Sequence, residues 1–426
     1  MIKKLVVLCF LCSWGLCFAQ GPQAASFYVY DYKAVTPLTP APAGYKPFYI
    51  SHFGRHGARY CTSEYETLHD IFAKASDKGL LTDVGKAFYE RYESYFRKVN
   101  PSKGNLTGIG KDQHRLIAAH VYQRFPELFD GPTRVEAVST ESPRVIMSMW
   151  SFLSSLQSLD SDIEIDADAS SKYASWLQPS LKSNPYLVKN AMRHGKAAET
   201  AVGEYFDKTV PWKEITLKFF TDAEVLEEAL GTTPSKFVEA LHAVVVCTYC
   251  LDFDNGCFDD LLSASEMEAI WKGISARYFL DTANYPGSGS LKLDYSAFTL
   301  GQIIESAEAD IASGDTQLRL RFGHDSGIAP LFAILDVNGW GRAASSFDEA
   351  IEIFPSYDIP MGASLQLVFF RNDGGDILLQ VLANEREASL PIDAVHGAFY
   401  RWNDFKAHYL PIVCSSKEKI LSATSL

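Results

Sequence analysis

Three short apolar segments, each followed by polar residues and a helix-like stretch, most strongly constrain how this chain can fold. They are FYISHFG (48–54), RVEAVST (134–140) and LRLRFGH (318–324), and they are rich in β-branched and aromatic residues, which favour strands. Strands that alternate with helices indicate an α/β fold, in which helices cover the sheet. We therefore expect an open, mostly parallel sheet flanked by helices.

Helix signals follow each of these strands. Ser142 and Pro143 provide an N-cap and a first-turn proline, and Pro126 marks a helix end. Residues 364–372 and 376–384 predict a hairpin around Gly374-Gly375. Helices are expected over residues 64–99, with a break at Lys78-Gly79, and over 108–125, 142–159 and 326–338.

The chain divides by composition into three parts. Residues 1–19 begin with Lys3 and Lys4, continue as an apolar run too short to span a bilayer and end at Ala19, which is typical of a secretory signal peptide. A buried N-terminal helix is the alternative. Residues 161–285 carry few strand signals and are predicted to form an inserted, mainly helical cap, while residues 20–160 and 286–426 form the α/β core.

Charge and cysteine content exclude some classes of function. The formal net charge is −13, which argues against a broad nucleic-acid surface, although clustered cations can still bind a small anion. No later segment predicts a membrane span. Cysteines outside the leader are odd in number, so at least one lacks an intramolecular partner, and their spacing does not predict zinc. They are Cys61, Cys247, Cys250, Cys257 and Cys414.

The tripeptide Arg-His-Gly occurs twice. The first copy directly follows the strand at 48–54 and reads Arg55-His56-Gly57-Ala58-Arg59, so two arginines flank the histidine at the end of a strand, where open α/β sheets bind ligands. Gly57 allows the backbone to approach a ligand closely. The second copy, Arg193-His194-Gly195, follows no strand and is typical of a helix C-terminus. His56 is therefore the candidate, with a structural histidine at a strand end as its alternative.

Two further strand ends carry similar residues. His324-Asp325 follows LRLRFG and precedes a helix, whereas His69-Asp70 lies within a helical segment and is interpreted as surface. Arg144 stands just past the strand at 134–140; without the other two sites it would equally be a solvated residue at a helix start. Strand ends on one sheet can face each other across a switch point.

Together these residues can carry out phosphoryl transfer. Four donors, Arg55, Arg59, Arg144 and His324, would surround a phosphate. Neighbouring arginines should lower the pKa of His56 and keep it neutral as a nucleophile, so that attack would form a phosphohistidine. Asp325 would protonate the leaving alcohol. Neither a metal nor a cofactor is required.

These motifs resemble the histidine acid phosphatases, the branch that holds phytases and multiple inositol polyphosphate phosphatases. RHGAR, the later HD, LTGIGKDQH (106–114), VSTESPRVIMSMWSFL (138–153) and VLANE (381–385) are similar to the motifs of that family. The resemblance implies that His56 is the nucleophile, that Asp325 is the proton donor, and that Gly57 helps to position His56. It implies phosphate binding by Arg55, Arg59, Arg144 and His324.

The sequence departs from the family at two positions. Cys61 stands where the family usually has proline, and we expect this to change loop stiffness and not chemistry. The second corner reads His-Asp-Ser, closer to phytases and glucose phosphatases than to the His-Ala-Glu of inositol polyphosphate phosphatases, whose C-terminal stretch this chain nevertheless resembles.

The leading hypothesis is a secreted or periplasmic phosphomonoesterase that acts on phytate or other inositol polyphosphates. A sugar-phosphate or broad-specificity acid phosphatase is the near alternative; a mutase-like phosphotransferase or a non-catalytic phosphate-binding protein is further away. A hexakisphosphate would need additional cations in the pocket, for which Arg91, Lys103, Lys189, Arg193 and Lys196 are candidates.

Overall fold

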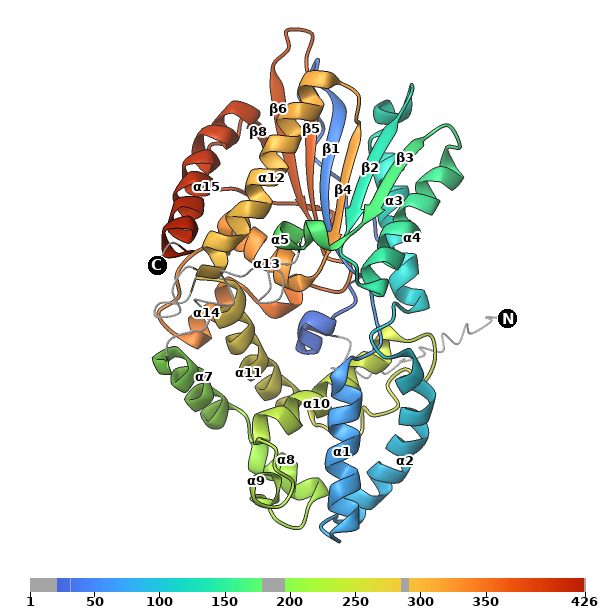
Figure 1. Ribbon diagram of the computed structural model, residues 1–426, viewed down its shortest axis with the longest axis vertical. Coiled ribbons are helices and arrows are strands. Elements are labelled where there is room, and N and C mark those ends of the chain that lie inside the picture. Colours follow the sequence, from blue (N-terminus) through green and yellow to red (C-terminus); the bar gives the residue numbers. More distant parts are fainter. Residues whose placement is uncertain (1–20, 31, 178–195, 285–290, 425–426) are drawn as a thin grey trace, which may run out of the picture.

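Strand β1 (Lys46–Arg55) lies at the centre of an eight-stranded sheet (Figure 1). The computed structural model describes residues 21–30, 32–177, 196–284 and 291–424, so the expected leader and the second Arg-His-Gly motif lie outside the described residues. The other strands are β2 (Arg134–Ser139), β3 (Glu164–Ala169), β4 (Leu318–Gly323), β5 (Ser364–Arg371), β6 (Ile377–Ala383), β7 (Arg386–Glu387) and β8 (Phe399–Arg401).

Helices make up most of the remaining described chain. They are α1 (Ser63–Asp77), α2 (Asp83–Val99), α3 (Gly108–Arg124), α4 (Pro143–Leu159), α5 (Ala174–Leu177), α7 (Lys196–Thr209), α8 (Trp212–Phe219), α9 (Val225–Glu228), α10 (Pro234–Cys247), α11 (Ala264–Thr282), α12 (Leu291–Ser313), α13 (Asp325–Ile334), α14 (Phe347–Ile353) and α15 (Trp402–Thr424). Short 3₁₀ turns, including η2 (Pro22–Phe27), connect some of them.

The sheet has a parallel half and an antiparallel half. The strand order is β3-β2-β4-β1-β5-β6-β7, with β8 paired to β6. Strands β3, β2, β4 and β1 run parallel to one another, whereas β5 pairs antiparallel with β1 and forms the predicted hairpin with β6. The expected α/β class, a mostly parallel sheet flanked by helices, is confirmed.

Helices cover both faces of the sheet because side chains alternate along each strand. Tyr49 and Phe53 of β1 pack with α12, α13 and α15 on one face. Ile50, with the opposite parity, packs with α3 and α4 on the other face. The site described below therefore rests on a sheet that is buried on both sides.

A separate helical lobe lies below the carboxyl ends of the parallel strands (Figure 1). Its core joins α1 and α2 to α8 and α10, through residues such as Phe72, Phe88 and Phe237. Thr82 caps α2 by accepting from the Gly85 N–H, and its own hydroxyl donates to the Lys218 carbonyl at the end of α8. Segments far apart in the sequence thus form one lobe.

This packing differs from the predicted boundaries of the inserted cap at two places. Strand β3 falls inside residues 161–285 yet pairs in parallel with β2 as part of the sheet. Helices α1 and α2 fall inside the predicted core but pack against α10 in the helical lobe.

Helix α13 is shorter than predicted. It ends at Ile334 instead of residue 338, because Asp336 and Asn338 adopt left-handed φ values of 50° and 54°.

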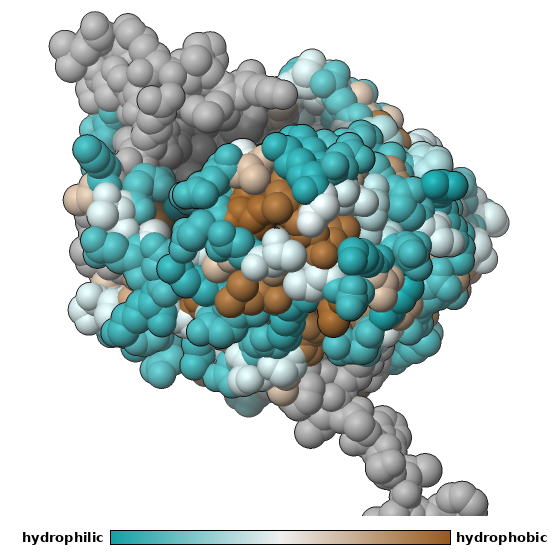
Figure 2. Space-filling view, turned by 90° about the horizontal axis from the view of Figure 1, so that it is seen from below, coloured by the Kyte–Doolittle hydropathy of each residue, from teal (hydrophilic) through white to brown (hydrophobic). Residues whose placement is uncertain are grey.

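The far end of the helical lobe exposes some apolar side chains (Figure 2). Polar residues surround the apolar ones in this view. Val84 of α2 and Leu217 of α8 are two of the large apolar side chains exposed in this lobe, at 56% and 50%. Among the described residues, no helix is both long enough and apolar enough to cross a membrane.

Two buried histidines lie near the carboxyl end of β1. His52 and His114 pack against Phe322, and both ring nitrogens of His52 are buried without a hydrogen-bond partner among the described residues. Burial lowers the pKa of each histidine to about 3, and the charge of Arg321 adds to the effect on His52. Both rings are therefore neutral in the folded protein.

This burial predicts acid-sensitive stability. A histidine whose folded-state pKa is depressed stabilises the fold above its unfolded pKa near 6.5, and this contribution is lost as the pH falls from there toward 3. Between pH 7 and pH 5 each such histidine should reduce the free energy of unfolding by about 2 kcal/mol. We expect His52→Leu to weaken the pH dependence by that amount in urea unfolding at both pH values. His396→Leu, at an exposed site, is the control; an unchanged slope in His52→Leu would contradict the prediction.

Candidate active site

Three parallel strands end at one edge of the sheet and bring the predicted site residues together. Arg55 at the end of β1 is in register with Gly323 of β4, and Ser139 of β2 is in register with Phe322. The residues that follow these strands, including His56, Arg144 and His324, therefore converge from distant parts of the sequence.

Arg55 is the most enclosed of the predicted residues, with 1% of its surface exposed. Its Nη1 donates to the carbonyl oxygens of Ser26 and Ile359, both at 2.6 Å. Its Nη2 donates to Oδ2 of Asp325 at 2.9 Å. Arg55 consequently has a single orientation, set by three segments of the chain.

The imidazole of His56 is buried and has a defined tautomer. Its Nδ1 lies 2.9 Å from the Gly57 carbonyl oxygen, which can only accept, so Nδ1 carries the hydrogen and Nε2 keeps a free lone pair. Burial and the nearby charges of Arg55, His324, Arg59 and Arg144 lower its pKa well below the ordinary value. The ring is therefore a neutral base with an available nitrogen.

Arg59 and Arg144 place further positive charge around His56. Arg59 donates to the Tyr60 carbonyl at 2.8 Å and lies 5.0 Å from the centre of the Phe27 ring. Burial, together with the charges of Arg59 and Arg55, lowers the pKa of Arg144 to about 10, although Asp325 opposes this. The Nε atoms of both Arg59 and Arg144 are buried without a partner among the described residues. They are unsatisfied donors close to a neutral histidine.

His324 lies between Arg144 and Thr140. Nη2 of Arg144 is 3.3 Å from its Nδ1, and the Thr140 hydroxyl is 3.2 Å from its Nε2. Because arginine can only donate, Nδ1 accepts here and Nε2 donates to the hydroxyl. Burial and the Arg144 charge lower the pKa of His324 to about 3. The centre of its ring lies 5.5 Å from the centre of the His56 ring, and the two rings meet edge to face.

Asp325 is ionised in this arrangement. Its Oδ1 accepts from the Ser326 N–H at 2.8 Å, and its Oδ2 accepts from Arg55. Burial favours the protonated form, but the charges of Arg55 and Arg59 outweigh it and lower the pKa below the ordinary value. The proposed donor is therefore a carboxylate before substrate binds.

Buried polar side chains from the motifs at 106–114 and 138–153, which were assigned no individual role from the sequence, hold the loop after β1. Ser148 Oγ accepts from the Gly57 N–H at 3.1 Å, and Gln113 Oε1 accepts from the Ala58 N–H at 2.7 Å. Gln113 also donates to the Met361 carbonyl at 2.8 Å. Ser148 follows Arg144 by four residues on one face of α4, so helical spacing was the available signal.

Two glycines make the turn after β1 possible by close backbone contact. A Cβ on Gly57 would lie 2.4 Å from the Gly110 carbonyl oxygen, and a Cβ on Gly110 would lie 2.2 Å from the Ala58 carbonyl oxygen. The start of α3 therefore packs directly on the loop that carries His56. Gly57 acts through sterics at this contact.

The other His-Asp pair lies elsewhere. His69 of α1 stacks on Phe96, with ring centres 4.1 Å apart, and contacts Glu93 in the helical lobe. His194 lies outside the described residues. Within the described part of the chain, no group of three or more histidine, cysteine or acidic residues could hold a metal ion.

Comparison with known proteins assigns the family. The model of the histidine phosphatase superfamily, branch 2, matches residues 53–384. The chain belongs to this family. No curated protein sequence matches it significantly. As a branch 2 histidine phosphatase the chain is a phosphomonoester hydrolase, which confirms the predicted enzyme class.

Solved structures show the same fold at low sequence identity. The multiple inositol polyphosphate phosphatase of Bifidobacterium longum, determined with inositol hexasulfate, has a TM-score of 0.76 and 19% identity, with 91% of this chain and 97% of that chain covered. The phytase of D. castellii has a TM-score of 0.66 and 15% identity, with 93% of this chain and 85% of that chain covered. The Citrobacter braakii phytase has a TM-score of 0.55 and 14% identity, with 86% of this chain and 98% of that chain covered.

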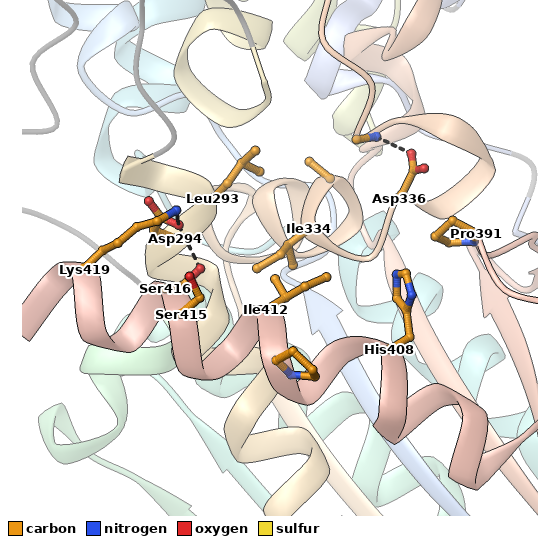
Figure 3. A pocket seen from close by; sticks show the side chains of 13 residues that line it. Leu293, Asp294, Ile334, Asp336, Pro391, His408, Ile412, Ser415, Ser416 and Lys419 are labelled. Atoms are coloured by element: carbon orange, nitrogen blue, oxygen red, sulfur yellow. Dashed lines mark hydrogen bonds and ion pairs between the residues drawn. The ribbon is translucent and has the colours of Figure 1, made fainter.

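The phosphatase has a further cavity of about 680 Å³ between α12, α13 and α15 (Figure 3). Leu293, Ile334 and Ile412 form its apolar part, while Asp294 is engaged by Ser416 and Lys419. None of the predicted phosphate-binding residues lines it, so it is not part of the site around His56.

The contact between Gly57 and Gly110 predicts a steric requirement in the phosphatase. Gly57→Ala should destabilise the fold by about 2 kcal/mol, because the methyl group meets backbone that cannot move independently. Guanidinium unfolding measures this, and activity should fall in parallel as the loop shifts. Gly203→Ala in α7, where nothing lies within 4 Å of the added carbon, is the matched control. Equal stability of the Gly57→Ala variant and the wild type would contradict the prediction.

Proposed function

We propose that this phosphatase hydrolyses phosphomonoesters through a phosphohistidine on Nε2 of His56. The observation that carries the proposal is the His56 tautomer: Nδ1 is tied to the Gly57 carbonyl, so the free lone pair is on Nε2. Attack on phosphorus would form a phosphorus–nitrogen bond and break the bond to the ester oxygen. A second attack, by water, would release phosphate.

Phosphate binding is assigned to Arg55, Arg59, Arg144 and His324. A dianionic phosphoryl group would satisfy the buried donors of Arg59 and Arg144 and offset the repulsion among the three arginines. His324 would exchange its tautomer, donating from Nδ1 to phosphate while Nε2 accepts from Thr140. The Thr140 hydroxyl permits this because it can either donate or accept.

Asp325 is assigned as the proton donor to the leaving alcohol. It is ionised in the free site, so its proton would arrive with the substrate. A phosphate monoester has a second pKa near 6, and its monoanion would transfer that proton to Asp325 once the arginines hold the dianion. The same proton would then pass to the ester oxygen as the bond to phosphorus breaks.

Inositol polyphosphates are the proposed substrate class. The support is the fold shared with the Bifidobacterium longum multiple inositol polyphosphate phosphatase and with phytases. Smaller phosphate esters are the second candidate, and a specific observation favours them. Arg91 pairs with Asp260 at 2.7 Å, and Lys103 pairs with Glu66, so each of these two predicted pocket cations already has a carboxylate partner. Lys189 and Arg193 lie outside the described residues.

A substrate panel tests both parts of the proposal. We expect His56→Ala to reduce phosphate release at about pH 5 by at least 10³-fold, because no nucleophile remains. His194→Ala, in the second Arg-His-Gly motif, should retain activity. Wild-type kcat/KM for phytate, glucose 1-phosphate and an aryl phosphate then decides the substrate class. Retained turnover in His56→Ala would refute the nucleophile, whereas preference for glucose 1-phosphate would refute only the inositol polyphosphate assignment.

Asp325→Asn tests proton donation through the leaving group. Loss of the donor should slow an alkyl phosphate by about 10²–10⁴-fold. An aryl phosphate, whose leaving group needs less protonation, should be affected much less. Wild-type kcat/KM should fall as the pH rises above about 6, because the substrate monoanion that supplies the proton disappears. Equal effects of the substitution on both substrates would show that Asp325 has a different role.

We also propose that residues 1–19 direct export and are removed near Ala19. The support is their charged start, short apolar run and small residue at position 19. Expression of the full chain in a bacterial host should give an extracytoplasmic enzyme whose N-terminal sequence begins near Gln20. A cytoplasmic product that retains Met1 would refute export.

A further inference from the structure

Three cysteines meet directly beneath the phosphate-binding loop. Cys61, Cys247 and Cys250, here called the thiol cluster, are each 0% exposed, and all three are unpaired thiols in this structure. Cys61 follows Arg59 by two residues, whereas Cys247 ends α10 and Cys250 closes the next 3₁₀ turn. The cluster therefore joins the loop of the active site to the helical lobe.

Contacts place the Cys61 sulfur along the last turn of α10. It lies 3.4 Å from the Ala243 carbonyl oxygen, one helical turn before Cys247, and it also interacts with the Cys247 sulfur. The Cys247 sulfur in turn lies 3.4 Å from the Arg59 carbonyl oxygen. Cys61 and Cys247 thus face each other across the interface of two segments that are far apart in sequence.

Cys247 is the thiol at the centre of the cluster. Both Cys61 and Cys250 interact with its sulfur, and the Tyr65 hydroxyl lies 3.5 Å from it. Burial raises the pKa of the Cys247 thiol, but these hydrogen bonds and the Arg59 charge outweigh burial and lower it well below the ordinary value. Burial raises the pKa of the Cys61 thiol. The thiolate form therefore concentrates on Cys247.

We propose that Cys61 and Cys247 form a disulfide that ties the phosphate-binding loop to helix α10. Cys250 is left as a thiol beside it. The other described cysteines take no part, since Cys257 is half-buried outside the cluster and Cys414 is exposed on α15.

The bond forms by thiol–disulfide exchange with a small-molecule disulfide such as glutathione disulfide. The Cys247 thiolate attacks one glutathione sulfur, forms a mixed disulfide and releases the other glutathione as a thiolate. The Cys61 thiolate then attacks the Cys247 sulfur and releases the second glutathione. Two protein thiols lose two electrons and two protons, and one glutathione disulfide becomes two thiols. Because the cluster is buried in the folded protein, this exchange takes place while the chain folds, before burial sets the pKa difference between the thiols, and the roles of Cys61 and Cys247 can then be exchanged.

The proposed disulfide would restrict the position of Arg59. The disulfide would enclose most of the helical lobe in a long covalent loop, which restricts the unfolded chain. It would also hold the main chain two residues from Arg59, whose carbonyl already contacts Cys247. Cys61 occupies the position where the resembled family usually has proline, so the cross-link would supply stiffness by a different chemical means.

Peptide mapping of the intact chain tests the proposal. The full chain is refolded in a glutathione redox buffer, free thiols are alkylated under denaturing conditions, and the digest is mapped by mass spectrometry without reduction. We expect a peptide pair linked through Cys61 and Cys247, with Cys250, Cys257 and Cys414 alkylated. Alkylated Cys61 and Cys247, or a link between Cys247 and Cys250, would overturn the proposal.

Stability and kinetics provide a second readout. Dithiothreitol should lower Tm by about 5 °C or more and raise KM for an aryl phosphate several-fold, because Arg59 loses its support. Cys61→Ala should remove both responses, whereas Cys257→Ala, the matched control, should keep them. If Cys61→Ala fails to fold, the peptide map of the wild type and the response of the wild type to dithiothreitol still test the proposal. A wild type whose Tm does not respond to dithiothreitol would also overturn the proposal.

Discussion

The ion pair between the buried Arg55 and the partly exposed Asp325 is the interaction on which the candidate active site depends. Burying the charge of Arg55 is costly, and a charged partner together with further hydrogen bonds offsets that cost. Here the carbonyls of Ser26 and Ile359 both accept from Nη1 of Arg55, whose Nε is buried without a partner among the described residues, and the Ser326 N–H donates to Asp325. The pair thereby joins the end of β1, the start of α13, the turn η2 and the segment before β5.

The same pair determines the charge state of the free site. It holds Asp325 as a carboxylate, while burial and the surrounding arginines keep His56 and His324 neutral. Positive charge is thus arranged around a neutral His56, the proposed nucleophile, before any phosphate is present, and a dianion would relieve the repulsion that the arginines exert on one another. In the proposed mechanism, substrate binding and the arrival of the proton on Asp325 are a single event.

Much of the fold and site could be predicted from local patterns. The strands and helices next to Arg55, Arg144 and His324 could be predicted from residue type and turn residues, and their predicted ends lie within about four residues of the ends in the structure. Other features could not be predicted because they depend on contacts between distant segments. Strand β3 joins the sheet by pairing with β2, and α1 and α2 join the helical lobe by packing on α10. The local sequence of these segments does not indicate which distant segment each will pair with or pack against.

The sequence by itself determined which chemistry is available, because residue type and placement at a strand end are local properties: a histidine between two arginines, an arginine after a second strand, and His-Asp after a third. Only the tertiary structure decided the protonation states and the supporting contacts. The His56 tautomer requires the Gly57 carbonyl, the ionised Asp325 requires Arg55, and the loop requires Gln113 and the close approach of Gly110. Hydrogen bonds and burial arise when the chain brings these groups together, and a linear pattern does not contain those distances.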